Sequence, residues 1–478
     1  MTTFQLRSGK MLVHSNLNIN ARTNMKSISS ILPRSSWIAF VIILAIPGFS
    51  NGSPDPIRID ARLDRPVIYA GQPGKVVVQV EIRPAMIASE EDRPPVNLAL
   101  VLDRSGSMRG EKIRQAIEAA QVAVGRLGPQ DVVSVVIYDN EIDTIAPAGK
   151  AVREYRESIR RELAKVRARG NTAIYGGLTQ AAAELRKFSK EGFINRLILL
   201  SDGLANQGPS TPADFERLAT AFASEDFIVS TIGLGLDFNE DIMTSLAAAG
   251  QGNTYFVETA GDLPRIFERE LGDILNVAAT DLEITIRGRE GIKILRGIGR
   301  EAELGENGIA RFRIPQVYGG LDKLALLELE VPKGAPGDRL DLVDIEVAYR
   351  VAGGDSIEQQ EIVVPVRYSD QREQIAQSVE NEVVANVANN VVAESKAQAI
   401  VLADAGDNGS AGEVLRQAAD ELVSEYDSYG AAPQVAPLAE EVEAEAEEVS
   451  SLGLSKRQRK IFRSESYQTV NQQEPAAE

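Results

Sequence analysis

Cysteine is absent from this 478-residue chain, which excludes disulfide bonds, thiolate nucleophiles and every zinc site with cysteine ligands. Histidine is nearly absent as well, since His14 is the only one. His14 lies ahead of a segment that the sequence marks for removal. Histidine general bases, Ser-His-Asp catalysis and histidine zinc sites are therefore excluded from the mature protein. Any remaining chemistry must use carboxylates, hydroxyls, Lys or Arg.

Aromatic residues are also scarce, at 5% of the chain, whereas Val, Ile, Leu and Ala supply most of the apolar content. This composition favours packed α/β and β-rich domains, and the length indicates two or three of them. The formal net charge is −18. Because phosphates repel such a chain, we expect no nucleic-acid partner.

The N-terminus has the pattern of a targeting segment. Residues 37–49 read WIAFVIILAIPGF, with basic residues before them and small polar residues after them. This run is short for a membrane span, which needs about 20 apolar residues. We therefore interpret residues 1–52 as a signal-peptide region, with Met25 favoured as the true start, and expect a secreted or periplasmic protein. The alternative is an uncleaved signal anchor that tethers the chain to a membrane, facing outside the cytoplasm.

The hydrophobic pattern predicts an α/β domain between flanking β-strands. From 96 to 279, short apolar runs alternate with helical segments, which predicts a central, mostly parallel sheet flanked by helices. Residues 53–95 and 280–368 alternate apolar and polar side chains, as strands of an antiparallel β-sandwich do. We expect the α/β domain to be inserted into this sandwich.

The C-terminal part changes to a helical period. Residues 369–430 predict an α-helical hairpin, whose second helix opens at a capping box formed by Ser410 and Glu413. Residues 431–478 carry an acidic stretch followed by a basic cluster, which favours a disordered, solvated tail. A further helix or coiled coil from Leu438 is the alternative.

The segment LVLDRSGSM, residues 100–108, carries the chemistry. It follows a predicted buried strand, so Asp103, Ser105 and Ser107 leave the carboxyl edge of the sheet, where open α/β sheets place their ligands. Alternate residues of an extended loop point the same way, so one carboxylate and two hydroxyls converge. Such hard oxygen donors suit Mg²⁺, or Mn²⁺ or Ca²⁺, rather than zinc or copper. The competing interpretation is that Asp and Ser only cap the following helix.

Three donors are too few for Mg²⁺, which takes six oxygen ligands. Two further segments supply candidates at matching places. The loop 170–172, GNT, precedes a predicted helix and offers the hydroxyl of Thr172. The segment 199–203, LLSDG, ends another core strand and offers the carboxylate of Asp202.

DRSGS, GNTAIYGGL and LILLSDG, in this order, resemble the metal-ion-dependent adhesion site of the von Willebrand factor A (VWA) domain. The resemblance covers residues 96–279 and implies a Rossmann-like α/β fold. It also implies that Ser105, Ser107 and Thr172 coordinate the cation directly or nearly so. Asp103 and Asp202 would act largely through water, and an Asp or Glu of a protein partner would take the sixth position.

The wider layout is loosely similar to the heavy chains of inter-alpha-trypsin inhibitor and to bacterial proteins labelled as calcium-activated chloride channel homologues. We expect a binding module, meaning an extracytoplasmic adhesion or scaffold protein that captures a partner carboxylate. At the rim of the site, Arg104, Met108 and Asn171 are candidates for tuning partner choice, or are merely exposed loop residues. The alternative functions are a metal-assisted hydrolase and a subunit of a larger envelope complex. We expect no enzyme, because no general base accompanies the site.

Overall fold

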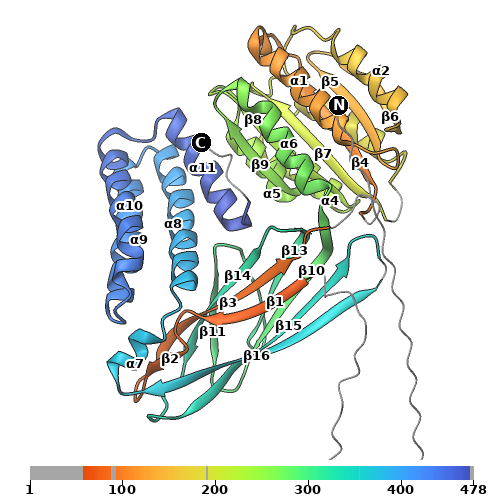
Figure 1. Ribbon diagram of the computed structural model, residues 1–478. Coiled ribbons are helices and arrows are strands. Elements are labelled where there is room, and N and C mark those ends of the chain that lie inside the picture. Colours follow the sequence, from red (N-terminus) through yellow and green to blue (C-terminus); the bar gives the residue numbers. More distant parts are fainter. Residues whose placement is uncertain (1–56, 88–92, 190–191, 355, 474–478) are drawn as a thin grey trace, which may run out of the picture. The chain divides into compact units, whose positions relative to one another are not determined.

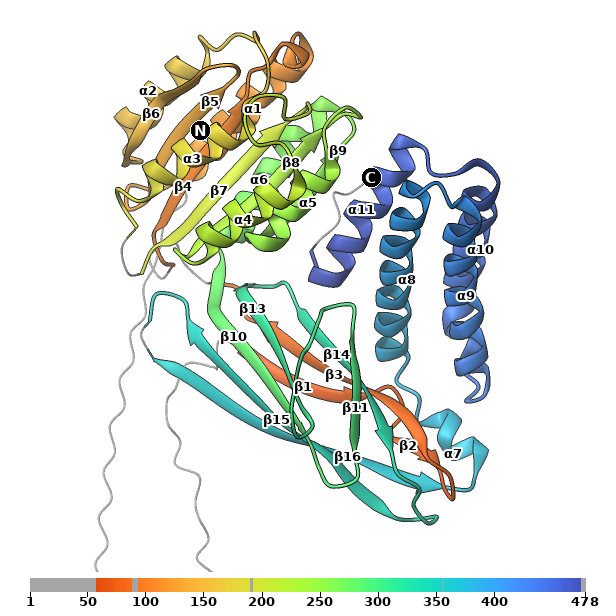
Figure 2. The same ribbon diagram turned by 180° about the vertical axis from the view of Figure 1, so that it is seen from behind.

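The computed structural model describes residues 57–87, 93–189, 192–354 and 356–473 (Figures 1 and 2). The signal-peptide region and Met25 lie outside these ranges, so the signal peptide remains a prediction from the sequence. Within the described ranges, no helix combines the length and the apolar character needed to cross a bilayer.

The α/β domain is built on a six-stranded sheet in the order β6-β5-β4-β7-β8-β9. Neighbouring strands run parallel, except that β6 is antiparallel to β5. The strands are β4 (Val96–Asp103), β5 (Val132–Tyr138), β6 (Ile142–Lys150), β7 (Ile194–Ser201), β8 (Phe227–Leu234) and β9 (Gln251–Val257).

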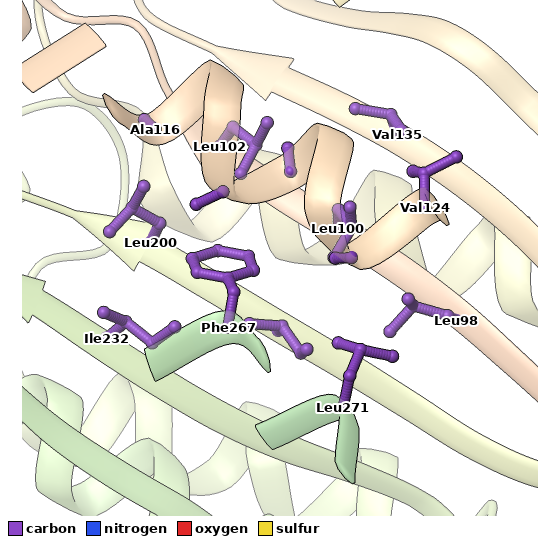
Figure 3. Close-up of a cluster of buried hydrophobic side chains, with 14 of the residues drawn as sticks. Leu98, Leu100, Leu102, Ala116, Val124, Val135, Leu200, Ile232, Phe267 and Leu271 are labelled. Carbon is purple, nitrogen blue, oxygen red and sulfur yellow. The ribbon is translucent and has the colours of Figure 1, made fainter. Parts of the chain in front are cut away.

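Helices cover both faces of this sheet, and β4 shows why its sequence is apolar throughout. Leu98, Leu100 and Leu102 pack on one face, against α1 and α6 (Figure 3), whereas Ala99 and Val101 face the core on the other side. A strand buried on both faces needs a continuous apolar run. The α/β prediction is confirmed. The helices on one face are α1 (Glu111–Arg126), α2 (Arg153–Leu163) and α6 (Leu263–Ile274), and those on the other are α3 (Ile174–Leu185), α4 (Pro212–Ala223) and α5 (Glu240–Ala249).

The strand order places a topological switch point between β4 and β7. The chain leaves β4 toward β5 on one side and leaves β7 toward β8 on the other. Because the two connections diverge, a crevice opens at the carboxyl ends of these two strands. Asp103 ends β4, and Ser201 ends β7 directly before Asp202. The fold thus places two of the predicted ligands at its natural ligand-binding position.

Two further sheets share one apolar core. Their orders are β1-β3-β14-β11 and β12-β13-β10-β15-β16-β2, and all pairings are antiparallel except that of β2 with β16. Because β3 pairs with β14, strands from before and after the α/β domain share one sheet. The strands are β1 (Ile57–Leu63), β2 (Val67–Tyr69), β3 (Gly74–Pro84), β10 (Val277–Gly288), β11 (Lys293–Ile298), β12 (Glu303–Gly305), β13 (Ile309–Tyr318), β14 (Lys323–Val331), β15 (Arg339–Val351) and β16 (Ile357–Ser369).

The C-terminal region is more helical than the sequence pattern predicts. The second hairpin helix is capped by Asp407, whose side chain accepts a hydrogen bond from the Ser410 N–H, rather than by Ser410 itself. The preference for a disordered tail at 431–478 is wrong, because two more helices cover 432–452 and 456–471. The helices are α7 (Arg372–Gln377), α8 (Asn381–Asp404), α9 (Asn408–Asp427), α10 (Ala432–Leu452) and α11 (Lys456–Asn471).

The acidic stretch forms a helix because its apolar residues share one face. Val435, Ala439, Val442, Ala446 and Val449 are separated by four and three residues in turn, and all are buried. They join the apolar core of α8 and α9, while most of the glutamates between them are exposed and Glu445 pairs with Lys396 of α8. The helical alternative therefore holds, and the helix begins at 432 rather than at 438.

Candidate metal site

Asp103 anchors the loop that follows β4. Its side chain is fully buried, at 0% exposure. One carboxylate oxygen accepts a hydrogen bond from the Ser105 N–H at 2.7 Å, and the other accepts one from the Ser201 hydroxyl at 2.8 Å. Asp103 thus joins the ends of two neighbouring strands and fixes the direction in which the loop leaves β4.

The two serines of the loop reach toward the other carboxylate. The hydroxyl oxygens of Ser105 and Ser107 lie 3.0 Å apart, and Ser107 Oγ donates to Asp202 Oδ1 at 2.6 Å. Asp202, like Asp103, is 0% exposed. Four of the five predicted ligands therefore form one hydrogen-bonded group between β4 and β7.

Thr172 joins this group from its own loop. A methyl group at Gly203 would lie 3.5 Å from both Ser107 Oγ and Thr172 Oγ1, so the two hydroxyls border one small space. Asn206 holds the threonine loop by accepting the Thr172 N–H at 2.8 Å. Gly170 O accepts the Gly106 N–H at 3.0 Å, which ties this loop to the serine loop.

The donor set fits a hard divalent cation. The hydroxyls of Ser107 and Thr172 border the space beside Gly203, and the Ser105 hydroxyl and the buried Asp202 carboxylate are linked to them through Ser107. Burial raises the pKa of Asp103 to about 6 and the nearby charge of Asp202 adds to the rise, whereas hydrogen bonds with Ser105 and Ser201 lower it. In the described part of the chain, no group of three or more Asp, Glu, His or Cys side chains is arranged to hold a metal ion.

Lys112 is a member of the site that the sequence pattern did not single out. It lies in the first turn of α1, and its ammonium contacts Asp202 Oδ2 at 2.6 Å. Helical spacing places it on the polar face of α1, which predicts a solvated side chain. The available signal was its position, because the first turn of a helix after such a loop lies at the sheet edge.

The rim assignment is partly wrong. Met108 is 0% exposed and packs into the core under α1, so it cannot contact a partner. Arg104 is 8% exposed, and its guanidinium pairs with Asp139 and with Asp143, the latter at 2.5 Å. Arg104 therefore stabilises its own domain through these ion pairs. Of the three rim candidates, only Asn171 is exposed.

Comparisons with known proteins agree with the fold. Residues 97–269 match the family model of the von Willebrand factor type A domain. The protein sll0103 of Synechocystis sp. is 29% identical over 231 residues, covering 47% of this chain and 54% of the relative. YfbK of Escherichia coli is 25% identical over 260 residues, covering 49% and 45%. The chain thus spans about half the length of these two relatives. Inter-alpha-trypsin inhibitor heavy chain H3 of Rattus norvegicus is 26% identical over 196 residues, covering 40% and 22%.

Solved structures show the same architecture. A von Willebrand factor type A protein from Catenulispora acidiphila superposes with a TM-score of 0.59 at 17% identity, covering 80% of this chain and 96% of that one. The ArnB paralog VWA2 from Sulfolobus acidocaldarius gives 0.53 at 19% identity, covering 87% and 98%. Residues 97–269 therefore form a von Willebrand factor type A domain, and the chain is a VWA domain protein related to sll0103 and YfbK and, more distantly, to the inter-alpha-trypsin inhibitor heavy chains.

Proposed function

We propose that this protein is a metal-dependent binding module that captures a carboxylate of a protein partner. Asp103, Ser105, Ser107, Thr172 and Asp202 would hold one Mg²⁺, Mn²⁺ or Ca²⁺ ion. The observation that carries the proposal is the convergence of three hydroxyls and two buried carboxylates at the switch point between β4 and β7.

The residues of the proposed site have different roles. Asp103 sets the course of the serine loop through its two hydrogen bonds. Ser105, Ser107 and Thr172 offer neutral oxygens, which leave more of a cation's charge uncompensated than carboxylates would. The bound ion would supply a positive centre for a carboxylate oxygen of the partner. Asn171, exposed beside Thr172, is placed to contact that partner.

Binding fits the site better than catalysis. Neither histidine nor cysteine occurs in the mature sequence, and the Lys112 ammonium is engaged with Asp202. Both carboxylates are fully buried and hydrogen-bonded, so neither is free to move a proton to or from a substrate. A hydrolase would require an exposed general base at this edge.

We place the protein outside the cytoplasm, secreted or periplasmic, on the basis of the pattern in residues 1–52. Cell fractionation followed by N-terminal sequencing of the mature chain tests this placement. Cleavage near residue 52 and an extracytoplasmic location are expected. An intact N-terminus in a membrane fraction would indicate the anchored alternative, and a cytoplasmic location would refute both.

Thermal unfolding tests the metal site. The purified chain is heated in EDTA and in millimolar Mg²⁺, Mn²⁺ or Ca²⁺, beside Ser107→Ala and the matched control Thr179→Ala. Thr179 lies exposed on α3 and bonds only its own helix. We expect at least one ion to raise the Tm of the wild type and the control by about 2–4 °C, with no rise for Ser107→Ala. The absence of a rise with any ion, or a rise kept by Ser107→Ala, would refute the site.

Carboxylate capture is tested separately with immobilised peptides that display Asp or Glu, beside matched Asn and Gln peptides. We expect retention of the wild type on the acidic peptides in the stabilising metal, and its loss in EDTA or with Ser107→Ala. Retention that persists in EDTA would show that the contact does not depend on the metal.

A further inference from the structure

A second site lies far along the chain from the metal ligands. A cavity of about 260 Å³, here called the junction cavity, is bordered by three parts of the molecule. The start of β9 contributes Gly252 and Asn253, and the strands of the sandwich contribute Tyr318 and Lys323. Helix α11 contributes Tyr467, and Arg300 reaches the cavity from the turn after β11.

Arg300 is an unpaired cation in this cavity. Its Nε is buried, and within the described ranges none of its N–H groups has a hydrogen-bond acceptor or an ion-pair partner. Burial lowers the pKa of Arg300, and the only opposing influence is the phenol of Tyr467. Because a guanidinium stays charged at neutral pH, a buried one normally pairs with an anion.

Lys323 adds a second buried cation. Its ammonium donates to the carbonyl oxygens of Asn471 at 2.7 Å and Gln472 at 3.2 Å, both of which are neutral. Burial lowers the pKa of Lys323 to about 7, and the charge of Arg300 lowers it further. Asp273 is the one carboxylate that opposes this shift.

The neighbouring charged groups do not supply the missing anion. Glu270 lies 3.6 Å from the guanidinium of the fully buried Arg196, and hydrogen-bonds Ser230, Asn253 and Tyr255. Arg313, at the cavity's rim, is exposed and pairs with Glu283 and Glu303. Two cations and a single opposing carboxylate therefore leave an excess of positive charge around the cavity.

We propose that the junction cavity binds a small oxyanion through Arg300 and Lys323, with inorganic phosphate as the free ligand that fits the chemistry best. The planar guanidinium presents paired N–H donors that match phosphate or carboxylate oxygens, and the ammonium keeps one N–H beyond the two it gives to carbonyls. The volume holds a phosphate with ordered water. The phenol of Tyr467 and the side chain of Asn471 line the same space.

The position of the cavity gives the oxyanion a structural consequence. Its walls come from the VWA domain, the sandwich and α11, so one bound ion contacts all three. An anion there would remove the repulsion between Arg300 and Lys323 and hold α11 against β9 more firmly. The junction cavity is separate from the proposed metal ligands, and oxyanion binding there does not depend on metal binding.

The test measures unfolding of the full chain in EDTA, so that the metal site plays no part. Phosphate, sulfate and chloride are compared at constant ionic strength, and phosphate binding is followed by calorimetry. The variants are Arg300→Gln, Lys323→Met and the control Arg153→Gln, an exposed arginine that pairs only with Glu157. A chain that ends at Gln473 is included, because Glu474 and Glu478 are a second source of the same oxyanion chemistry.

We expect phosphate to raise the Tm of the wild type and of Arg153→Gln by about 2–4 °C, and chloride to have no effect. Arg300→Gln should lose the phosphate response. In phosphate-free buffer this variant should unfold at the same temperature as the wild type or higher, because the substitution removes a positive charge that nothing compensates there. A phosphate response confined to the shortened chain supports the site and identifies the tail carboxylates as its occupant. A response kept by Arg300→Gln, or absent from the wild type and the shortened chain alike, overturns the proposal.

Discussion

Lys112 occupies a position in its helix that is electrostatically unfavourable, and its neighbour Asp202 offsets this cost. A cation in the first turn of a helix is repelled by the positive end of the helix dipole. Here the ammonium pairs with Asp202, whose carboxylate is fully buried. Lys112 therefore neutralises part of the buried charge of Asp202, and it would compete with the proposed divalent cation for the same carboxylate.

Replacing Lys112 with glutamine should raise the affinity for Mg²⁺ by up to about fivefold, because a partly exposed ion pair contributes about 0.2–1 kcal/mol. Titration calorimetry measures the change. The control is Lys165→Gln, which removes the same charge from an exposed lysine of the same domain. An unchanged or weaker affinity for Lys112→Gln would show that the ammonium does not compete with the ion.

Lys323 predicts a pH dependence of stability. Its pKa in the folded chain is about 7, below the ordinary 10.5, so the unfolded chain binds more protons between these values. The contribution of Lys323 to the free energy of unfolding therefore rises as the pH increases from about 7 to about 10.5. Urea denaturation in phosphate-free buffer measures the stability of the wild type and of Lys323→Met. Across this pH window, the free energy of unfolding of the wild type should rise relative to that of Lys323→Met. A flat difference would mean that the lysine is not desolvated.

At the residue scale, the sequence could predict that Asp103, Ser105, Ser107 and Asp202 lie close together, because they stand at or just after the ends of neighbouring strands, whereas Thr172 comes from the loop before α3. Asp103 and Asp202 end neighbouring strands, so strand order alone brings them together. Met108 was misplaced because its burial depends on how α1 folds back over the sheet, which no local pattern records. Lys112 was missed because helical spacing places it on the polar face of α1, although its position in the first turn indicated the sheet edge.

The two C-terminal helices show how one composition can favour two structures. The density of glutamates in α10 predicts a solvated tail, whereas the four-and-three spacing of its buried residues predicts a packed helix. The spacing was the better guide, but its small alanines made the apolar face weak. Nothing local indicated that the basic residues of α11 pair with acids of α5, more than 200 positions earlier.

Helix α11 is held to the VWA domain by charge. Arg459 is 18% exposed in its side chain and contacts Glu240, Asp241 and Asp404. The hydroxyl of Tyr467 donates to Gly252 O at 2.6 Å. Arg459 thus joins the start of α5 and the end of α8 to the same helix, so it contributes to stability through a network rather than a single pair.

Arg459→Met should lower the free energy of unfolding by about 1–3 kcal/mol, because it leaves partly buried carboxylates without their shared partner. Arg457→Met serves as control, since Arg457 is 57% exposed and pairs only with Glu258. Its loss should change stability by less than about 1 kcal/mol. Chemical denaturation measures both. Equal effects of the two substitutions would show that the network adds nothing beyond a surface ion pair.

At the scale of the whole molecule, the connections to the sandwich leave the proposed metal site open. The chain enters the VWA domain at the start of β4 and passes into the sandwich after α6, which runs back toward the starts of the parallel strands. Both connections therefore lie at the amino edge of the sheet. The metal ligands lie at the carboxyl edge, where Asp103 and Ser201 end their strands. This arrangement suits a domain that presents one edge to a partner.

Binding of Mn²⁺ to the whole chain, followed by the loss of the free-ion signal in electron paramagnetic resonance, tests the central claim most directly. The variants are Thr172→Ala, which removes one proposed ligand, and Gly203→Ala, which fills the space between the hydroxyls. Thr179→Ala is the control. We predict one bound Mn²⁺ per chain for the wild type and the control, and an affinity at least about tenfold weaker for the other two, equivalent to ~1.4 kcal/mol. Equal binding by all four chains, or no binding by the wild type, would contradict a metal site at this edge of the sheet.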